Sequence, residues 1–201
     1  MSRPDPVLVL ASKSAARAAL MRGAGLDFTT ASAGVDEDLV KHGLLGRGAS
    51  PREVAHVLAE EKAKACSLRE PGLVVGADQT LDLEGRLMDK PGSVEEARRH
   101  LLDMRGREHR LHSGVAVAEA GEIVFTTVET AVLKVRAFSD AWLDRYLDRN
   151  GAQILSCVGA YQLEGEGVQL FERIEGDYFV ILGLPLLSLL SFLRDRGALP
   201  E

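Results

Sequence analysis

Apolar residues in this chain fall either in short continuous runs or at helical spacing. Val7–Ala11 and Leu73–Ala77 are continuous apolar runs, which is typical of strands buried on both faces. Residues 109–118 and 122–135 have the pattern of two long strands that turn at Ala120-Gly121. Because segments with helical spacing lie between these runs, the pattern predicts an α/β fold with a mixed sheet and flanking helices.

Shorter strands and loops are expected between these elements. Phe28–Ala31 is predicted to be a second strand, and Thr80–Met88 a short hairpin that turns at Glu84-Gly85. Residues 35–49 and 151–167 are rich in glycine, and we expect both segments to be loops.

Capping residues mark where two helices begin. Ser50-Pro51-Arg52-Glu53 supplies an N-cap, a proline at the first helical position and the glutamate of a capping box. Ser93 and Glu96 form a second such box, for a helix that ends near Met104. The other expected helices span residues 14–22, 140–149 and 185–196.

Two basic residues lie on helix faces that should be apolar. Lys62 falls near the middle of the apolar face of the helix that starts after Ser50, and Arg17 shares a face with Leu20 and Met21. Burying a lone cation is costly unless it is paired or hydrogen-bonded. Each residue therefore needs an anionic partner, which is either a protein carboxylate or a ligand.

Composition limits the class of protein. A chain of 201 residues that is 46% hydrophobic can form one domain with a sizeable core, and we expect residues 1–201 to be a single domain. A net charge of -6 argues against a nucleic-acid partner or a membrane surface. Cys66 and Cys157 lack metal-binding spacing. The start MSRPDPVLVLASKS has no signal-peptide core, and residues 181–193 are too few to span a bilayer. The prediction is a cytoplasmic protein.

The first strand leads through Ser12-Lys13-Ser14 into a helix N-terminus, which favours an anion. The hydroxyls of Ser12 and Ser14 add hydrogen-bond donors, and Arg17, one turn further, can bind a phosphate with its guanidinium fork. The alternative is that a serine only caps the helix and Arg17 pairs with a core carboxylate.

Acidic and basic residues follow the second buried run. Asp78 comes directly after Leu73–Ala77, so we expect it at the C-terminal end of a strand, where it can act as a general base or a metal ligand. Lys90, before Pro91, can point into the same cleft. Asp36-Glu37-Asp38 suits a hard divalent cation. The alternatives are an Asx turn at Asp78, a solvated Lys90 and solvated loop acids.

Other notable side chains receive no chemical role. His109 and His112 should face opposite sides of a strand and so cannot form a ligand pair. Trp142 and Tyr146 have core spacing on a helix. Leu186–Leu193 is predicted to be a buried helix, with a dimer surface as the alternative.

Several short motifs follow one another along nearly the whole chain. They are LASKSAARAALMRGAG, VDE, LAEEKAKA, VVGADQT, DKPGSVEEA, RGREHRLHSGVAV, VGAYQLEG, LFERIEGDYF and LGLPLL. From about Val7 to Gly197 the chain resembles the Maf family of nucleoside triphosphate pyrophosphatases.

The resemblance implies an elongated domain of two lobes around a central cleft, and a homodimer. It implies hydrolysis of a nucleoside triphosphate to the monophosphate and pyrophosphate with Mg²⁺ or Mn²⁺. It places Asp78 as proton acceptor and Glu37 as a metal contributor. The residues that it places around the triphosphate are Ser12, Arg17, Lys62 and Lys90.

Four positions bear on which base is recognised. Ala16 stands where the family usually has a large side chain, whereas Gln79 and Glu164 match the branch that acts on 7-methyl-GTP, as does Cys157. A carboxylate such as Glu164 can accept hydrogen bonds from a guanine edge. The sequence thus favours a modified or purine-like nucleotide such as 7-methyl-GTP. The alternatives are a dTTP/UTP pyrophosphatase of the same family and a non-catalytic nucleotide-binding regulator of cell division.

Overall fold

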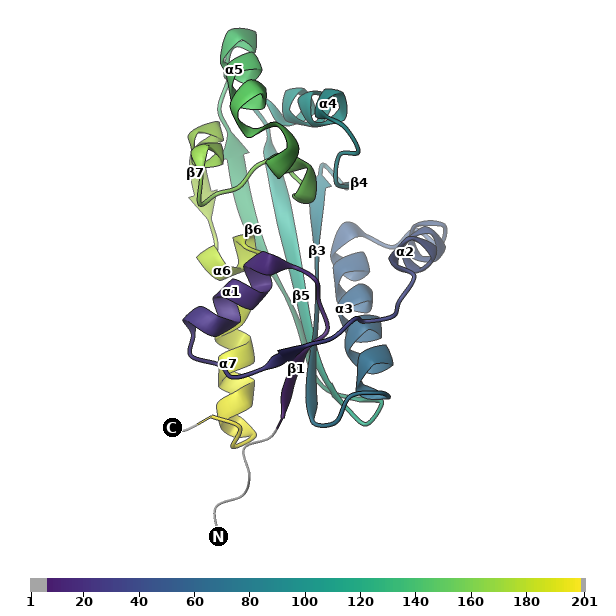
Figure 1. Ribbon diagram of the computed structural model, residues 1–201. Helices are drawn as coiled ribbons and strands as arrows, with labels where there is room; N and C mark the ends of the chain where they lie inside the picture. The colour runs from purple at the N-terminus through teal and green to yellow at the C-terminus, as the bar shows by residue number, and fades with distance from the viewer. Residues whose placement is uncertain (1–6, 200–201) are drawn as a thin grey trace.

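A seven-stranded mixed sheet forms the centre of the computed structural model, which describes residues 7–199 (Figure 1). The strand order is β2-β1-β3-β5-β6-β7, and β4 pairs with β3. β1 is parallel to β2 and β3, and the other pairs are antiparallel. The predicted mixed α/β class is confirmed. The strands are β1 Leu8–Leu10, β2 Thr29–Thr30, β3 Leu73–Leu83, β4 Arg86–Met88, β5 Glu108–Glu119, β6 Glu122–Val135 and β7 Phe171–Glu175.

The helices begin where the capping residues predicted. Ser50 and Glu53 form both bonds of a capping box, whereas Ser93 accepts from the Glu96 amide and the Glu96 side chain bonds Gly92 instead. Within residues 7–199, no helix combines the length and the apolar character needed to cross a membrane. The helices are α1 Ala15–Gly23, α2 Glu37–Leu45, α3 Pro51–Ser67, α4 Val94–Met104, α5 Asp140–Asn150, α6 Tyr178–Ile181 and α7 Leu186–Asp195, with 3-10 helices η1 Gly151–Ser156 and η2 Glu166–Leu170.

Residues 1–6 and 200–201 lie outside the described part of the chain. They include both ends of the expected 1–201 domain. They also include the first six residues of the N-terminal stretch for which the sequence predicts no signal peptide.

Two glycine-rich segments that were predicted to be loops contain helices. In residues 35–49, the Asp36 carboxylate accepts from the Leu39 amide and begins α2, with Glu37 and Asp38 in its first turn. Residues 151–167 contain η1 and the start of η2, and residues 157–165 between them form a loop as predicted. Cap chemistry outweighs the glycine content in α2, because an acidic first turn suits the helix dipole.

Strand β3 is also longer than predicted. It runs without a break through Asp78 and turns at Glu84-Gly85, so the prediction that Asp78 ends a strand is wrong. Asp78 lies mid-strand because β5 pairs with β3 continuously from Val74 to Asp82.

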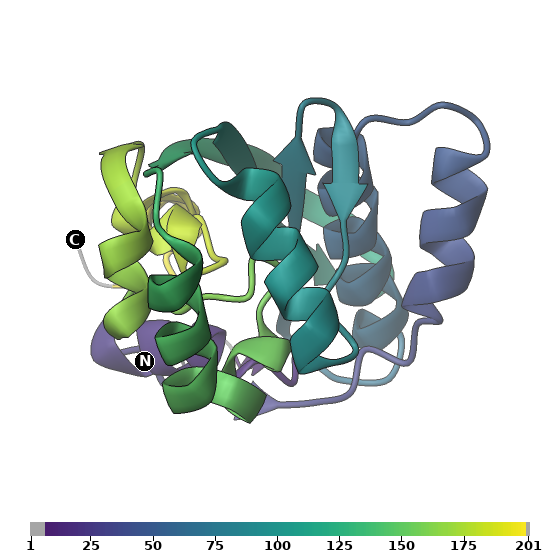
Figure 2. The same cartoon turned by 90° about the horizontal axis from the view of Figure 1, so that it is seen from above.

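Helices cover the sheet on both faces. In β3, alternate residues such as Val75 and Ala77 belong to a cluster with α1 and α7, and Leu81 belongs to a second cluster with α4 and α5. The residues of opposite parity face α3. Figure 2 shows α2 on the outer side of α3, away from the sheet. The two clusters share one sheet face, and β3 passes from one to the other near Asp78.

Small residues let α3 lie close to the sheet. A Cβ atom on Gly76 would stand 2.3 Å from the Ala59 carbonyl oxygen, and one on Gly114 would stand 2.5 Å from the Ala55 carbonyl oxygen. At both positions the nearest atom belongs to the backbone of α3. A change of side-chain rotamer therefore cannot relieve either clash. The spacing between α3 and β3 therefore depends on these two glycines.

We expect Gly76→Ala to lower the free energy of unfolding by about 1–3 kcal/mol, because overpacking forces the backbone to shift. Urea denaturation measures it. Gly43→Ala is the matched control, since Gly43 lies in exposed α2 with open space around its Cβ position. That control should be neutral or stabilise the protein by up to about 1 kcal/mol. Equal stability of the two variants would contradict the close contact.

Candidate active site

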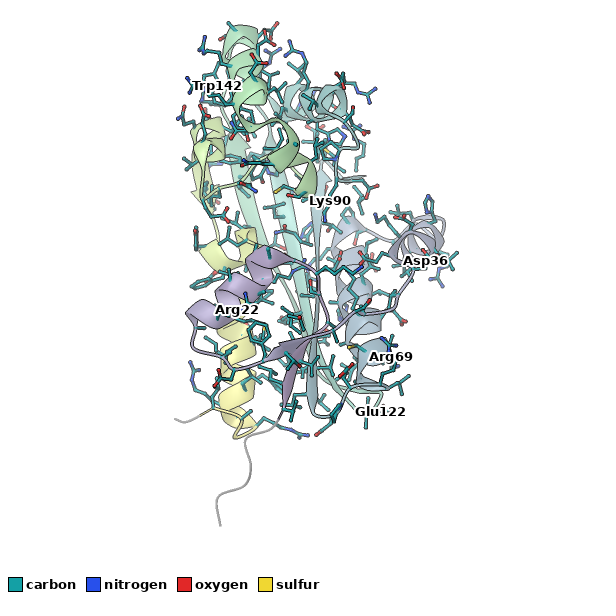
Figure 3. The ribbon with its side chains drawn as sticks, viewed as in Figure 1. Arg22, Asp36, Arg69, Lys90, Glu122 and Trp142 are labelled. Atoms are coloured by element: carbon teal, nitrogen blue, oxygen red, sulfur yellow. The ribbon has the colours of Figure 1, made fainter. Side chains whose placement is uncertain are left out.

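A cleft of about 900 Å³ opens beside the middle of β3. β1 pairs with β3 as far as Val75, and β4 pairs with it from Leu81 onward. Between these points, no other described strand pairs with that edge of β3. Lys90 and Asp36 mark the segments before α4 and at the start of α2 that border the cleft (Figure 3). The predicted site residues that line the cleft are Ser12, Ser14, Ala16, Arg17, Glu37, Lys62, Asp78, Gln79, Lys90 and Glu164.

Lys62 joins two carboxylates of the cleft. Its Nζ lies 2.6 Å from Asp78 Oδ1 and 2.9 Å from Glu37 Oε2, and its side chain is only 6% exposed. A buried ammonium requires such partners. The sequence left two alternatives for Lys62, a protein carboxylate or a ligand in a cleft. In the structure Lys62 pairs with protein carboxylates and also lines the cleft, because its partners are themselves cleft residues.

Arg17 is held by neutral oxygens. Its Nε donates to the Gly183 carbonyl at 2.8 Å, and its Nη1 donates to the Ala77 carbonyl at 2.9 Å and to Ser12 Oγ at 3.2 Å. The bond to Ala77 fills the open edge of β3 next to Asp78. Burial lowers the pKa of Arg17, and the charges of Asp78 and Glu37 oppose that effect. Arg17 thus stays fixed against the cleft without a carboxylate bonded to its guanidinium.

The serines at the start of α1 serve the fold and the cleft together. Ser14 Oγ accepts from the Arg17 amide and caps α1, as the structural alternative predicted. Ser12 Oγ accepts from the Ser14 amide and from Arg17 Nη1. A hydroxyl that accepts two bonds still has its own proton to donate, so Ser12 can donate to an anion in the cleft.

Sequence reasoning missed a second bridging lysine. Lys41 Nζ lies 2.5 Å from Asp89 Oδ1 and 3.7 Å from Asp38 Oδ1. Burial lowers the pKa of Lys41, but the hydrogen bond and charge of Asp89, with those of nearby acids, outweigh it and raise the pKa. The Asp38–Lys41 spacing is a helical signal that the loop prediction for this segment concealed.

Positive and negative side chains balance in the cleft. Its basic lining residues are Lys13, Arg17, Lys41, Lys62 and Lys90, and its acidic ones are Glu37, Asp38, Asp78, Asp89 and Glu164, five of each. The lining therefore has no formal net charge. A polyanion entering it meets as many carboxylates as cations.

Gln79 uses its amide nitrogen within the protein. Nε2 contacts Ser113 Oγ, the Val180 carbonyl and the Ile181 carbonyl, each at 3.0 Å. These contacts hold the end of α6, from which the Gly183 carbonyl reaches Arg17. The Gln79 nitrogen thus positions backbone, and its carbonyl oxygen is the part left to face a ligand.

Another wall of the cleft comes from residues 156–164, which include Cys157, Tyr161 and the exposed Glu164. The hydroxyl oxygen of Tyr161 lies 2.8 Å from His109 Nε2. Burial lowers the pKa of His109 to about 4 and raises that of Tyr161. The sequence assigned no role to His109. In the structure it is buried and contacts the cleft residue Tyr161.

Comparison with known proteins decides the family. The model of the family described as "Maf-like protein" matches residues 7–196. The chain belongs to this family. A Caulobacter vibrioides protein named nucleoside triphosphate pyrophosphatase is 58% identical over 192 residues, 96% of each chain. A Rhizobium meliloti protein named 7-methyl-GTP pyrophosphatase is 49% identical over 195 residues, 96% of this chain and 98% of that protein. A Brucella suis protein with that second name is 49% identical over 188 residues, 93% of this chain and 94% of that one.

Stability of this Maf-like protein should fall in mild acid because of His109. Its pKa is about 4 in the fold, below the ordinary 6.5, so the unfolded chain takes up a proton first. The stabilisation is complete above pH 6.5 and is lost as the pH falls toward 4, by at most about 3 kcal/mol. Urea unfolding between pH 7 and 4.5 measures it. His109→Gln should show a shallower fall than the wild type, and parallel curves would contradict the assignment.

Proposed function

We propose that this chain is a nucleoside triphosphate pyrophosphatase, which hydrolyses its substrate to a nucleoside monophosphate and pyrophosphate. The names of its relatives support this activity. The observation that carries it is the convergence of Asp78, Glu37 and Lys62 in a cleft that also presents Arg17 and Lys90. A carboxylate base beside several cations suits attack of water on a phosphoanhydride.

In this proposal Asp78 accepts the proton of the attacking water. Lys62 holds one oxygen of that carboxylate at 2.6 Å, which fixes its orientation and leaves the other oxygen for the water. Arg17, Ser12 and Lys90 bind phosphate oxygens and stabilise the charge that develops on the transferring and leaving phosphates. The reaction needs no protein nucleophile, because positioning and charge supply most of the catalysis.

A divalent cation, Mg²⁺ or Mn²⁺, fits the residues present. Glu37 is the carboxylate that would hold it, because the two oxygens of Asp78 are assigned to Lys62 and to the attacking water. Such ions commonly bind through one or two carboxylates completed by substrate phosphates. The described residues contain no group of three or more His, Cys, Asp or Glu side chains that could hold a metal ion by themselves. When bound, the ion would neutralise phosphate charge. The balanced charge of the cleft favours a substrate that enters as its metal complex.

For the base we propose recognition by Glu164, with 7-methyl-GTP as the preferred substrate. Glu164 is exposed at the cleft wall, and its carboxylate can accept from a guanine edge and attract a methylated, positively charged base. Ala16 is also part of the lining, and its single methyl group leaves room for a base there. The competing candidate is a preference for dTTP or UTP.

We also infer a homodimer in the cytoplasm. Leu187 on α7 and Tyr178 on α6 are large apolar side chains that are 56% and 49% exposed, which supports a contact with a second copy. Cys66 and Cys157 are free, which suits a reducing compartment.

Asp78→Asn should lower turnover of nucleoside triphosphates about 10²-fold or more, because the amide cannot accept the water proton. Pyrophosphate release from a panel of nucleotides, with Mg²⁺ and with Mn²⁺, measures it. Asp103→Asn is the control, since Asp103 is a half-exposed acid that pairs with Arg86 outside the cleft. Equal inactivity of wild type and Asp78→Asn across the panel would favour the non-catalytic regulator.

The wild type should turn over 7-methyl-GTP with a higher kcat/KM than dTTP or UTP. Glu164→Gln should narrow that ratio about ten-fold, because the amide presents one acceptor and no charge to the base. Glu172→Gln, an exposed acid on β7, serves as the matched control. A higher kcat/KM for dTTP or UTP in the wild type would overturn the assignment.

A further inference from the structure

The cleft wall that carries Glu164 has little regular structure of its own. We call residues 157–164 the recognition loop. It lies between η1 and η2 and contains no helix or strand. Ala160 in its centre has a positive φ of 54°, which is strained for a residue with a side chain. Such a loop keeps one conformation only if the surrounding structure holds it.

Tyr161 is the side chain by which this loop enters the core. Its ring packs against Phe171 with centroids 4.8 Å apart and planes at 77°. A Cβ atom on Gly159 would stand 2.2 Å from Tyr161 Cε1, and one on Gly167 would stand 3.0 Å from Tyr161 Cβ. The backbone on both sides of Tyr161 thus lies directly on its side chain, so a shift of the ring must move the loop.

A polar contact with β5 fixes the ring. Tyr161 Oη lies 2.8 Å from His109 Nε2, and His109 Nδ1 has no hydrogen-bond partner among the described residues. A neutral imidazole and a phenol carry two polar protons, but the pair makes one hydrogen bond. One buried donor therefore stays unsatisfied whichever tautomer forms.

This imperfect pairing needs an explanation beyond stability. Phenylalanine at position 161 would make the same ring contacts without requiring a histidine partner. A buried polar contact with an unsatisfied donor costs free energy, whereas its direction fixes the position of what it holds. What it holds here is the loop that ends at Glu164.

We propose that Tyr161 is a positioning residue for nucleotide recognition, with His109 as its anchor. The hydrogen bond between them fixes the position of the recognition loop relative to the rest of the cleft. It thereby fixes where the Glu164 carboxylate contacts the base. This inference rests on the proposed function, in which Glu164 recognises the base. It adds to the determinants of specificity two residues that act through the position of Glu164.

Tyr161→Phe tests the proposal, because it keeps the ring and removes the hydroxyl. The measurements are kcat and KM for 7-methyl-GTP and for dTTP. We expect KM for 7-methyl-GTP to rise about five-fold with kcat nearly unchanged, and the preference over dTTP to fall by a similar factor. A loss of stability alone would change the amount of folded enzyme and leave KM and the preference as they are.

The matched control is Thr130→Val. Thr130 Oγ1 lies 2.8 Å from His112 Nδ1, so this change removes the hydroxyl from a part-buried histidine–hydroxyl contact of β5 that lies outside the cleft, although Thr130 itself is exposed. Its KM values should equal those of the wild type. If Tyr161→Phe matches this control, or weakens both nucleotides equally, the positioning role is wrong.

A second variant tests the proposal independently if Tyr161→Phe does not fold. Gly159→Ala places a Cβ against the Tyr161 ring and must move the loop while both partners of the hydrogen bond remain. It should show the same rise in KM and loss of preference, and circular dichroism confirms folding. Unchanged KM values in this folded variant would also overturn the proposal.

Calorimetric binding of the same two nucleotides separates this inference from the proposed activity. If the wild type releases no pyrophosphate, the activity fails. The positioning role then still predicts that Tyr161→Phe loses the binding preference for 7-methyl-GTP. A binding preference equal to that of the wild type would refute it.

Discussion

The close approach of α3 to β3 is the contact on which the arrangement of the cleft depends. Gly76 and Gly114 let the helix backbone rest on the strands, and this spacing brings Lys62 Nζ within 2.6 Å of Asp78 Oδ1. A helix held off by ordinary side chains would lie further from the sheet, because a Cβ atom at either glycine would collide with the helix backbone. Lys62 and Asp78 would then lose their direct contact, and Lys62 would keep only Glu37 as its carboxylate partner. The packing of α3 on the sheet and the position of the Lys62–Asp78 pair therefore depend on the same two glycines.

Charge pairing explains how a cleft so rich in ionisable groups can fold without a ligand. Lys62 and Lys41 each bridge acids from different elements, and both bridges reach α2, which has no buried residue. Buried ions are tolerated only while they have partners. A substrate phosphate that takes Lys62 must therefore be accompanied by positive charge for Glu37 and Asp78. The same pairing that stabilises the free protein thus supports the proposal of a nucleotide that enters with a metal ion.

Local signals predicted the parts of the site that depend on local structure. The capping box at Ser50 located α3, and helical spacing then placed Lys62 on its inner face. The same reasoning put Asp78 at a strand end, because no sequence pattern reveals that β5 continues the pairing past Ala77. It also missed β7, whose pairing with β6 is a tertiary contact. The error at α2 was avoidable, since Asp36 and the acidic first turn are cap signals that outweighed the glycines.

In the proposed function, the groups that bind the phosphates and the group that recognises the base lie on different kinds of structural element. Lys62 is fixed by a helix, Asp78 by a long strand and Arg17 by backbone carbonyls. Glu164 instead stands on a loop that is held by the Tyr161–His109 contact and by the bond from the Tyr146 hydroxyl to the Ala160 carbonyl. Sites on regular elements keep their geometry, while loops change with little cost to the fold. Relatives that are 58% and 49% identical over nearly the same span carry names that differ only in the nucleotide. When the residues proposed for the reaction lie on regular elements and the residue proposed for base recognition lies on a loop, the substrate can change while the reaction remains the same.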